Sequence, residues 1–188
     1  VVIGIDIAGL VGDDGPTHHG VFDVGILRGI PNIIIGQPKD AIEAQHMLYT
    51  AFQQTHPFAI RYARGEVPYS KVAECELMAI GSWEMVYEPQ DVQAYVLVYG
   101  EDVEKVESKL ASNEMPCGVI NARFFKPIDM NMIDYLVEKK VPVIVYEHDM
   151  LIGGLGSAVL EYLADNNKTL QVIRLGIKDE YVPQGAIN

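Results

Sequence analysis

Residues 9–23 (GLVGDDGPTHHGVFD) gather glycines, aspartates and two adjacent histidines on backbone that cannot form a helix. The segment follows an apolar, strand-like run at residues 1–5, and ligands of open α/β sheets bind in loops beyond the carboxyl ends of strands. Asp14 and His18 can supply acid–base groups, and the glycines let the backbone approach a ligand closely. Glycine, aspartate and proline also form ordinary turns, but a turn needs no pair of histidines. We therefore predict a functional loop here.

A metal site in the same loop is an alternative. Its ligands would come from Asp13, Asp14, His18 and His19. Carboxylates and imidazoles ligate metal ions, but residues adjacent in sequence rarely point at one ion. Acid–base chemistry is therefore the favoured interpretation of the loop.

A pair of arginines ends another predicted strand. Residues 61–65 (RYARG) place Arg61 and Arg64 three positions apart, and an arginine fork suits phosphate or carboxylate. Because side chains alternate along a strand, at most one of the two is expected to face a given site. An ordinary surface salt bridge is the alternative.

A glycine turn lies in residues 147–159 (EHDMLIGGLGSAV), between a predicted strand and a predicted helix. This is the context in which a turn binds a nucleotide phosphate. Only Gly154 and Gly156 fit the G-x-G pattern, and Val159 stands where a third glycine would be. We expect this turn to serve close packing rather than a dinucleotide.

Strands and helices alternate along the chain. Strands are predicted at 1–5, 32–36, 57–62, 94–99, 117–121, 141–146 and 171–175, with helices after Asp40, from about Asp102, at 129–138 and around 159–163. Residues 121–129, with Arg123 and Lys126, read as a strand-to-helix connection. The alternation implies right-handed crossovers, so the predicted fold class is α/β, with two modules built on mainly parallel sheets.

Composition limits the partners and the compartment. Acidic residues number 26 against 14 basic ones, and the net charge of −12 argues against nucleic acid. The apolar runs are too short to cross a membrane. Cys75 and Cys117 form no metal or redox motif, which favours a reduced, cytoplasmic protein and leaves one disulfide as the alternative. The chain opens directly on a strand-like run, as if inside a domain.

Several stretches together resemble one family. In chain order they are DIAGLVGDDGPTHHGVFD, LRGIPNIIIGQPKD, QHMLYTAF, AIRYARG, INARFFKPID and GGLGSAVLEYL, and they are similar to the second half of the 1-deoxy-D-xylulose-5-phosphate synthases. The D-G-x-T-H segment is shared with the wider transketolase group. The combination of T-H-x-G-x-F-D with R-x-x-R-G favours the synthases. The resemblance implies a partial pyrimidine-binding domain at 1–66, a linker at 67–80 and a transketolase-type C-terminal domain at 81–188.

The family enzymes are homodimers that condense pyruvate with glyceraldehyde 3-phosphate and release carbon dioxide. They use thiamine diphosphate and magnesium, and their product enters isoprenoid and thiamine biosynthesis. By resemblance, His18 assists proton transfer at the thiamine-bound intermediate, Asp14 binds substrate beside it, and Arg64 holds the acceptor's phosphate. The family pattern D-R-A-G reads Asp6-Ile7-Ala8-Gly9 here, so a phosphate-binding guanidinium is replaced by an alkyl group at Ile7.

The resemblance also implies parts that this sequence does not contain. The family's thiamine-activating glutamate and its diphosphate- and metal-binding domain lie upstream of the matched region. We therefore expect a missing N-terminal half as partner. We expect neither tight binding of the cofactor nor activity from this chain alone. A non-catalytic assembly half and a transketolase-type enzyme with a different acceptor aldehyde are the alternatives.

Overall fold

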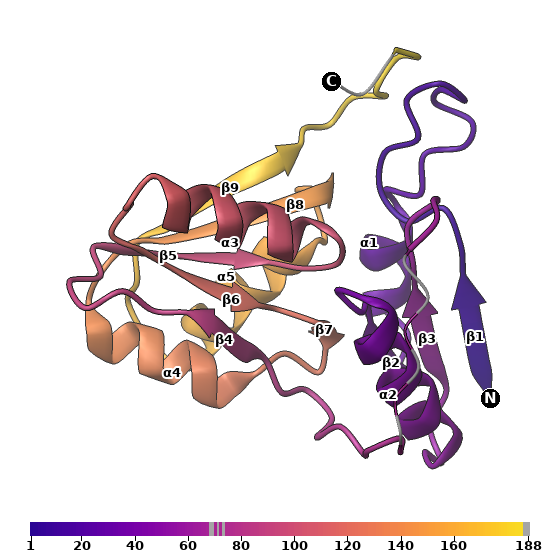
Figure 1. The fold of residues 1–188 in the computed structure, drawn as a ribbon, viewed down its shortest axis with the longest axis horizontal. Coiled ribbons are helices and arrows are strands. Elements are labelled where there is room, and N and C mark those ends of the chain that lie inside the picture. Colours follow the sequence, from indigo (N-terminus) through magenta and orange to yellow (C-terminus); the bar gives the residue numbers. More distant parts are fainter. Residues whose placement is uncertain (68–69, 71, 73, 186–188) are drawn as a thin grey trace.

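The computed structural model describes residues 1–67, 70, 72 and 74–185, and it contains two β-sheets with flanking helices (Figure 1). The first sheet has the order β1 (Val2–Ile5), β3 (Phe58–Arg61), β2 (Ile34–Gly36), β7 (Phe124–Lys126). The second has the order β4 (Glu84–Tyr87), β6 (Cys117–Asn121), β5 (Ala94–Val98), β8 (Val143–Met150), β9 (Val172–Ile177). The helices are α1 (Asp23–Arg28), α2 (Ala41–Phe52), α3 (Asp102–Ser112), α4 (Met130–Lys139) and α5 (Leu155–Asp165).

The predicted α/β class with mainly parallel sheets is confirmed. In the first sheet β3 pairs parallel with β1 and β2, and in the second β5 pairs parallel with β6 and β8, and β8 with β9. The pairs β2–β7 and β4–β6 are antiparallel. Every strand predicted from the sequence is present, while α1, β4 and β7 were not predicted. Residues 68, 69, 71 and 73 of the predicted linker lie outside the described residues.

Residues 121–129 are more than the strand-to-helix connection that the sequence predicted. Phe124–Lys126 forms β7, which pairs with β2 and so carries the later part of the chain into the first sheet. The Phe124 ring is fully buried and its centroid lies 6.1 Å from that of Phe58. Burial of these aromatic rings stabilises the junction, so the two sheets share one apolar core.

Side-chain hydrogen bonds fix the start of α2. The Asp40 carboxylate accepts a hydrogen bond from the Glu43 N–H at 2.7 Å, and the Glu43 carboxylate accepts one from the Lys39 N–H at 2.6 Å. Asp40 therefore caps a free amide in the first turn of the helix, and Glu43 binds the backbone just before the helix begins. Met47 and Ala51, one turn apart, are buried against the sheet.

No helix among the described residues is long and apolar enough to span a membrane. Cys75 and Cys117 are both free thiols.

Candidate functional site

The loop that carries Asp14 and His18 is closed at its base by two glycines. The Gly9 N–H donates to the Gly20 carbonyl at 2.8 Å, and the Gly20 N–H donates to the Gly9 carbonyl at 2.9 Å. A Cβ at Gly20 would lie 2.0 Å from the Ile7 carbonyl oxygen, so no larger residue fits there. We call this pair of hydrogen bonds the clasp.

Above the clasp the chain folds into a tight turn. The N–H groups of Asp14 and Gly15 both donate to the Val11 carbonyl, at 3.0 and 3.2 Å. The His18 N–H then donates to the Gly15 carbonyl at 3.0 Å. Gly15 has a φ of +77°, a conformation that glycine adopts without strain. This turn places Asp14 and His18 on one short, hydrogen-bonded segment.

The two adjacent histidines have different surroundings. His19 is 7 % exposed, and its Nδ1 accepts a hydrogen bond from the Val11 N–H at 3.0 Å. His18 is exposed, and its Nδ1 lies 3.0 Å from the Thr17 hydroxyl. His19 therefore supports the turn from inside, while His18 is available to a ligand. Within the part of the chain that the structure describes, no group of three or more His, Cys, Asp and Glu side chains can hold a metal ion.

Asp14 and Arg64 form an ion pair, although 50 positions separate them in the sequence. Each follows a strand of the first sheet, Asp14 after β1 and Arg64 after β3. Since β1 and β3 pair in parallel, the segments after them leave the same edge of the sheet. The side chains are 31 % and 59 % exposed, so both can be reached from solvent. The remaining N–H groups of Arg64 can bind a phosphate or a carboxylate.

Arg61 points away from this pair into the protein, as strand alternation predicts. Its Nη2 donates to Asp149 Oδ1 at 2.6 Å and to the Gly20 carbonyl at 3.0 Å, and its Nε donates to Asp23 Oδ2 at 2.8 Å. The Arg61 side chain is fully buried. It therefore stabilises the clasp and is not a ligand-binding arginine.

The end of β8 also contacts both sides of the clasp. His148 packs on Gly9 so closely that a Cβ at Gly9 would lie 2.8 Å from its Cδ2. Asp149 holds Arg61, and the Met150 N–H donates to the Val21 carbonyl at 3.1 Å. The C-terminal sheet therefore supports the base of the loop through three consecutive residues.

Sequence reasoning missed these residues because the strand was predicted to end at 146, where the polar residues begin. Alternation along the strand could have revealed them, because every second side chain faces the protein interior. The inward side chains are those of Val143, Val145, Glu147 and Asp149, and all four are buried. A carboxylate can continue the inward face of a strand when a cation or backbone N–H groups neutralise it.

His148 is held by a carboxylate on its other side. Its Nδ1 lies 3.3 Å from Asp102 Oδ2, and its ring stands edge-on to Tyr99 with centroids 4.9 Å apart. Burial acts to lower the pKa of His148, but the hydrogen bond to Asp102 and the charge of Asp149 outweigh it, and the pKa is raised. The same contact lowers the pKa of Asp102 to about 2.

The glycine turn before α5 serves packing, as the sequence predicted. A Cβ at Gly153 would lie 2.9 Å from the Gly25 Cα, so α1 approaches this turn closely. The N–H groups of Leu155 and Gly156, which a phosphate would need, donate to the Glu147 carboxylate at 2.8 and 3.3 Å. Burial raises the pKa of Glu147 from its ordinary value of 4.5 to about 7.

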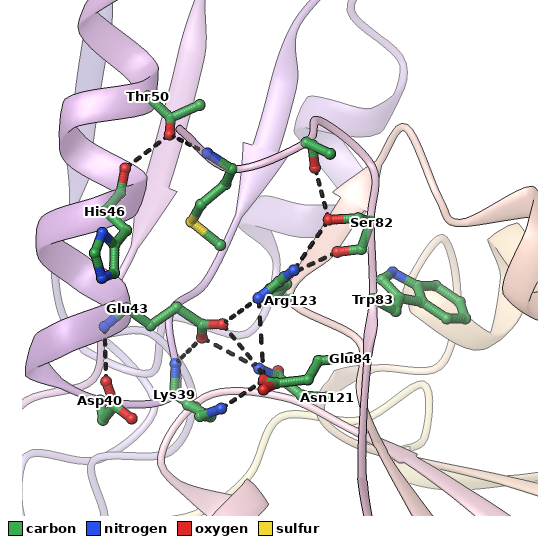
Figure 2. Close-up of polar contacts among 12 residues, drawn as sticks. Lys39, Asp40, Glu43, His46, Thr50, Ser82, Trp83, Glu84, Asn121 and Arg123 are labelled. Atoms are coloured by element: carbon green, nitrogen blue, oxygen red, sulfur yellow. Dashed lines mark hydrogen bonds and ion pairs between the residues drawn. The ribbon is translucent and has the colours of Figure 1, made fainter. Parts of the chain in front are cut away.

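Arg123 and Lys126 are engaged in contacts within the protein (Figure 2 for Arg123). Arg123 Nη1 donates to Glu43 Oε1 on α2 at 3.0 Å, and its Nε donates to the Ser82 carbonyl at 2.9 Å. Asn121 Nδ2 donates to the same Glu43 oxygen at 3.0 Å. Lys126 Nζ donates to backbone carbonyls at and just after the end of α1. Asn121 and Arg123 therefore join the second sheet to α2, and Lys126 joins β7 to α1.

Comparison with models of known families shows to which family this chain belongs. Residues 1–70 match the transketolase pyrimidine binding domain, and residues 91–187 match the transketolase C-terminal domain. The chain belongs to the transketolase family.

Named relatives agree with the resemblance seen in the sequence. The chain is 42 % identical over 194 residues to the 1-deoxy-D-xylulose-5-phosphate synthase of Listeria monocytogenes serotype 4b. It is 43 % identical over 193 residues to that of Listeria innocua serovar 6a. These alignments cover 100 % of this chain and 32 % and 30 % of the two synthases. The chain therefore spans about a third of the length of these relatives.

Solved structures show the same architecture. A structure described as a split gene transketolase, inactive beta4 tetramer, matches with a TM-score of 0.79 and 26 % identity, covering 95 % of this chain and 58 % of that one. Transketolase from Campylobacter jejuni matches with a TM-score of 0.69 and 17 % identity, covering 98 % of this chain and 28 % of that one. The second likeness concerns the fold alone.

Proposed function

We propose that this chain is the pyrimidine-binding and C-terminal part of a thiamine-diphosphate-dependent transferase. The transferase condenses pyruvate with glyceraldehyde 3-phosphate, releases carbon dioxide and forms 1-deoxy-D-xylulose 5-phosphate. The observation that carries this proposal is the ion pair between Asp14 and Arg64 on the turn of His18. It unites an anion-binding fork, a carboxylate and an accessible imidazole, and the similarity to the synthases over the whole chain supports it.

Each of these residues has a role in the proposed reaction. Arg64 binds the phosphate of the acceptor aldehyde through its forked N–H donors. Asp14 orients Arg64 and accepts a hydrogen bond from a substrate hydroxyl. His18 moves a proton to or from the reacting oxygen, the task for which imidazole is best suited near neutral pH.

Thiamine diphosphate, when bound, supplies the carbanion chemistry. The exposed turn offers the acid–base and anion-binding groups that complement such a cofactor. We assign neither its diphosphate nor a magnesium ion to any residue of this chain. A homodimer, a cytoplasmic location and a place in isoprenoid and thiamine biosynthesis belong to the same proposal.

An unphosphorylated acceptor aldehyde is a second candidate substrate, and Ile7 favours it. The resemblance implies an arginine at this position, which would add a second guanidinium to the phosphate site. Ile7 has a φ of +60°, an outlying conformation for a β-branched residue. Such strained positions cluster at functional sites. An alkyl side chain here would favour an acceptor with less charge.

A non-catalytic assembly half is a candidate from a different class. The observation in its favour is the likeness to a protein described as an inactive beta4 tetramer of a split gene transketolase. The first proposal differs because it requires synthase activity when this chain is joined with the remaining part of a synthase polypeptide. We call that joined protein the complete enzyme.

The proposed function is tested by the kinetics of Arg64→Ala in the complete enzyme. Losing a charge-assisted hydrogen bond should raise the KM for glyceraldehyde 3-phosphate about 10- to 150-fold. Glyceraldehyde, which lacks the phosphate, is the matched substrate, and its KM should not change. Equal effects on both aldehydes would exclude Arg64 as the phosphate-binding residue. Absence of any product with pyruvate and either aldehyde would favour the assembly half.

A further inference from the structure

The chain that follows β9 returns to the loop that carries His18 (Figure 1). The Gly185 N–H donates to the Gly12 carbonyl at 3.0 Å. Gln184 Nε2 donates to the Asp13 carbonyl at 2.8 Å. Both acceptors lie directly before Asp14. The C-terminal segment therefore binds the turn at the position where its candidate substrate-binding residue begins.

Packing brings the same segment against the other side of the turn. A Cβ at Gly15 would lie 3.1 Å from Gln184 Cβ, so Gln184 rests on the residue that follows Asp14. Contacts on both sides of Asp14 limit how far this part of the turn can move. Gln184 is exposed, so its hydrogen bond to Asp13 is formed by a side chain that solvent could also bind.

A second contact holds the segment near the base of the loop. The Tyr181 ring stands edge-on to Phe22, with centroids 5.9 Å apart. The Leu151 N–H donates to the Ile177 carbonyl at 2.8 Å, which fixes the start of the segment to the end of β8. The segment thus leaves β9 next to the end of β8, passes Phe22 and reaches the turn.

We propose that residues 181–185 form a strap that positions the turn of Asp14 and His18, with Gln184 as the positioning residue. The strap fixes the carbonyls of Gly12 and Asp13 and so restricts the backbone from which both side chains project. Its effect on catalysis rests on the function proposed above. Its effect on the turn does not.

The chain offers matched variants at both strap residues. Gln184→Glu keeps the shape but removes the N–H donor, while Gln184→Lys restores a donor of similar reach. Gly185→Pro removes the backbone N–H, while Gly185→Ala keeps it, and a Cβ there meets no atom within 4 Å. Each variant that removes a hydrogen-bond donor therefore has a control variant at the same position that keeps one.

Amide hydrogen exchange of Gly15 and His18, measured by NMR on the 188-residue chain, tests the strap. Exchange should become about 5-fold faster in Gln184→Glu and in Gly185→Pro, as for the loss of one neutral hydrogen bond. Gln184→Lys and Gly185→Ala should exchange like the unchanged chain. Equal exchange in all four variants, or faster exchange in the two donor-keeping variants, would overturn the strap.

Kinetics of the complete enzyme then separate the strap from the function. If both hold, the two variants with faster exchange lose kcat, and Gln184→Lys recovers it. Faster exchange with unchanged kcat would support the strap and would contradict the catalytic role of His18 and Asp14. Unchanged exchange would overturn the strap whatever the kinetics.

Discussion

Arg61 and Asp149 form a buried ion pair that joins the two sheets. Arg61 Nη2 lies 2.6 Å from Asp149 Oδ1, and the side chains are 0 % and 1 % exposed. Burial acts to lower the pKa of Arg61, but the charges of Asp149 and Asp23 outweigh it and raise the pKa above its usual range. Tyr99 donates a further hydrogen bond to Asp149 at 2.5 Å. The guanidinium therefore stays charged and needs its partner.

Removing the charge of Asp149 should destabilise the protein strongly. Asp149→Asn leaves a buried guanidinium without its main partner, which costs about 3–5 kcal/mol. Glu161→Gln is the matched control, because Glu161 pairs with Arg28 but is 61 % exposed, and an exposed pair contributes about 0–1 kcal/mol. Urea unfolding measures both. Equal losses for the two variants would mean that the Arg61–Asp149 pair does not join the sheets as described.

The clasp predicts a strict need for glycine at position 20. In Gly20→Ala the new methyl group would lie 2.0 Å from the Ile7 carbonyl oxygen, so the loop base must open. We expect a loss of more than about 2 kcal/mol of unfolding free energy. Gly29→Ala is the control, since its Cβ would meet its nearest neighbour at 3.7 Å, an ordinary contact. Thermal unfolding compares them, and a stable Gly20→Ala would refute the clasp.

Glu147 should make stability fall as pH rises. Its pKa is about 7 in the folded protein and near 4.5 in the unfolded chain. Between pH 4.5 and pH 7 the folded state therefore binds more protons than the unfolded state. The free energy of unfolding therefore decreases across that window, by about 3 kcal/mol for this group. Glu147→Gln removes the titration.

Urea unfolding at about pH 4.5 and about pH 8 measures this effect of Glu147. The unchanged chain should lose about 3 kcal/mol more than Glu147→Gln over this interval. Glu161→Gln, at an exposed carboxylate, should behave like the unchanged chain. The same pH dependence in Glu147→Gln and in the unchanged chain would show that burial does not raise this pKa.

Ile7 should limit the capture of a phosphorylated aldehyde. Ile7→Arg adds the forked donor that the resemblance implies for the phosphate site, and in the complete enzyme it should lower the KM for glyceraldehyde 3-phosphate about 10- to 150-fold. Ile7→Leu removes the β-branch at φ +60° without adding charge, and its KM should stay as it was. A KM that is already low and does not improve in Ile7→Arg would reject this role for Ile7.

Sequence reasoning found the parts of the site that depend on strand ends. The sequence placed Asp14 and Arg64 each after a strand, and strand alternation separated Arg61 from Arg64. The ion pair between Asp14 and Arg64 was not predicted, because it depends on the pairing of β1 with β3. The packing role of the glycine turn was also predicted. The features that were predicted follow from local geometry, which a single sequence shows.

The remaining features depend on contacts between distant segments. The strand ending at Met150 and the β7 pairing depend on partners far away in the chain. The sequence predicted the end of β8 too early because its last residues are polar. Their neutralising partners, such as Arg61, lie on another sheet. The position of Gln184 on the turn had no local signal at all.

The proposed role of His18 as the proton-transferring residue of a synthase is tested by the turnover of the complete enzyme. The measurement is the rate of 1-deoxy-D-xylulose 5-phosphate formation from saturating pyruvate and glyceraldehyde 3-phosphate. His18→Ala should lower kcat roughly 10²- to 10⁴-fold. His56→Ala, at an exposed histidine before β3, should leave kcat unchanged. An unchanged kcat in His18→Ala, or an equal loss in His56→Ala, would contradict the role of His18 in proton transfer.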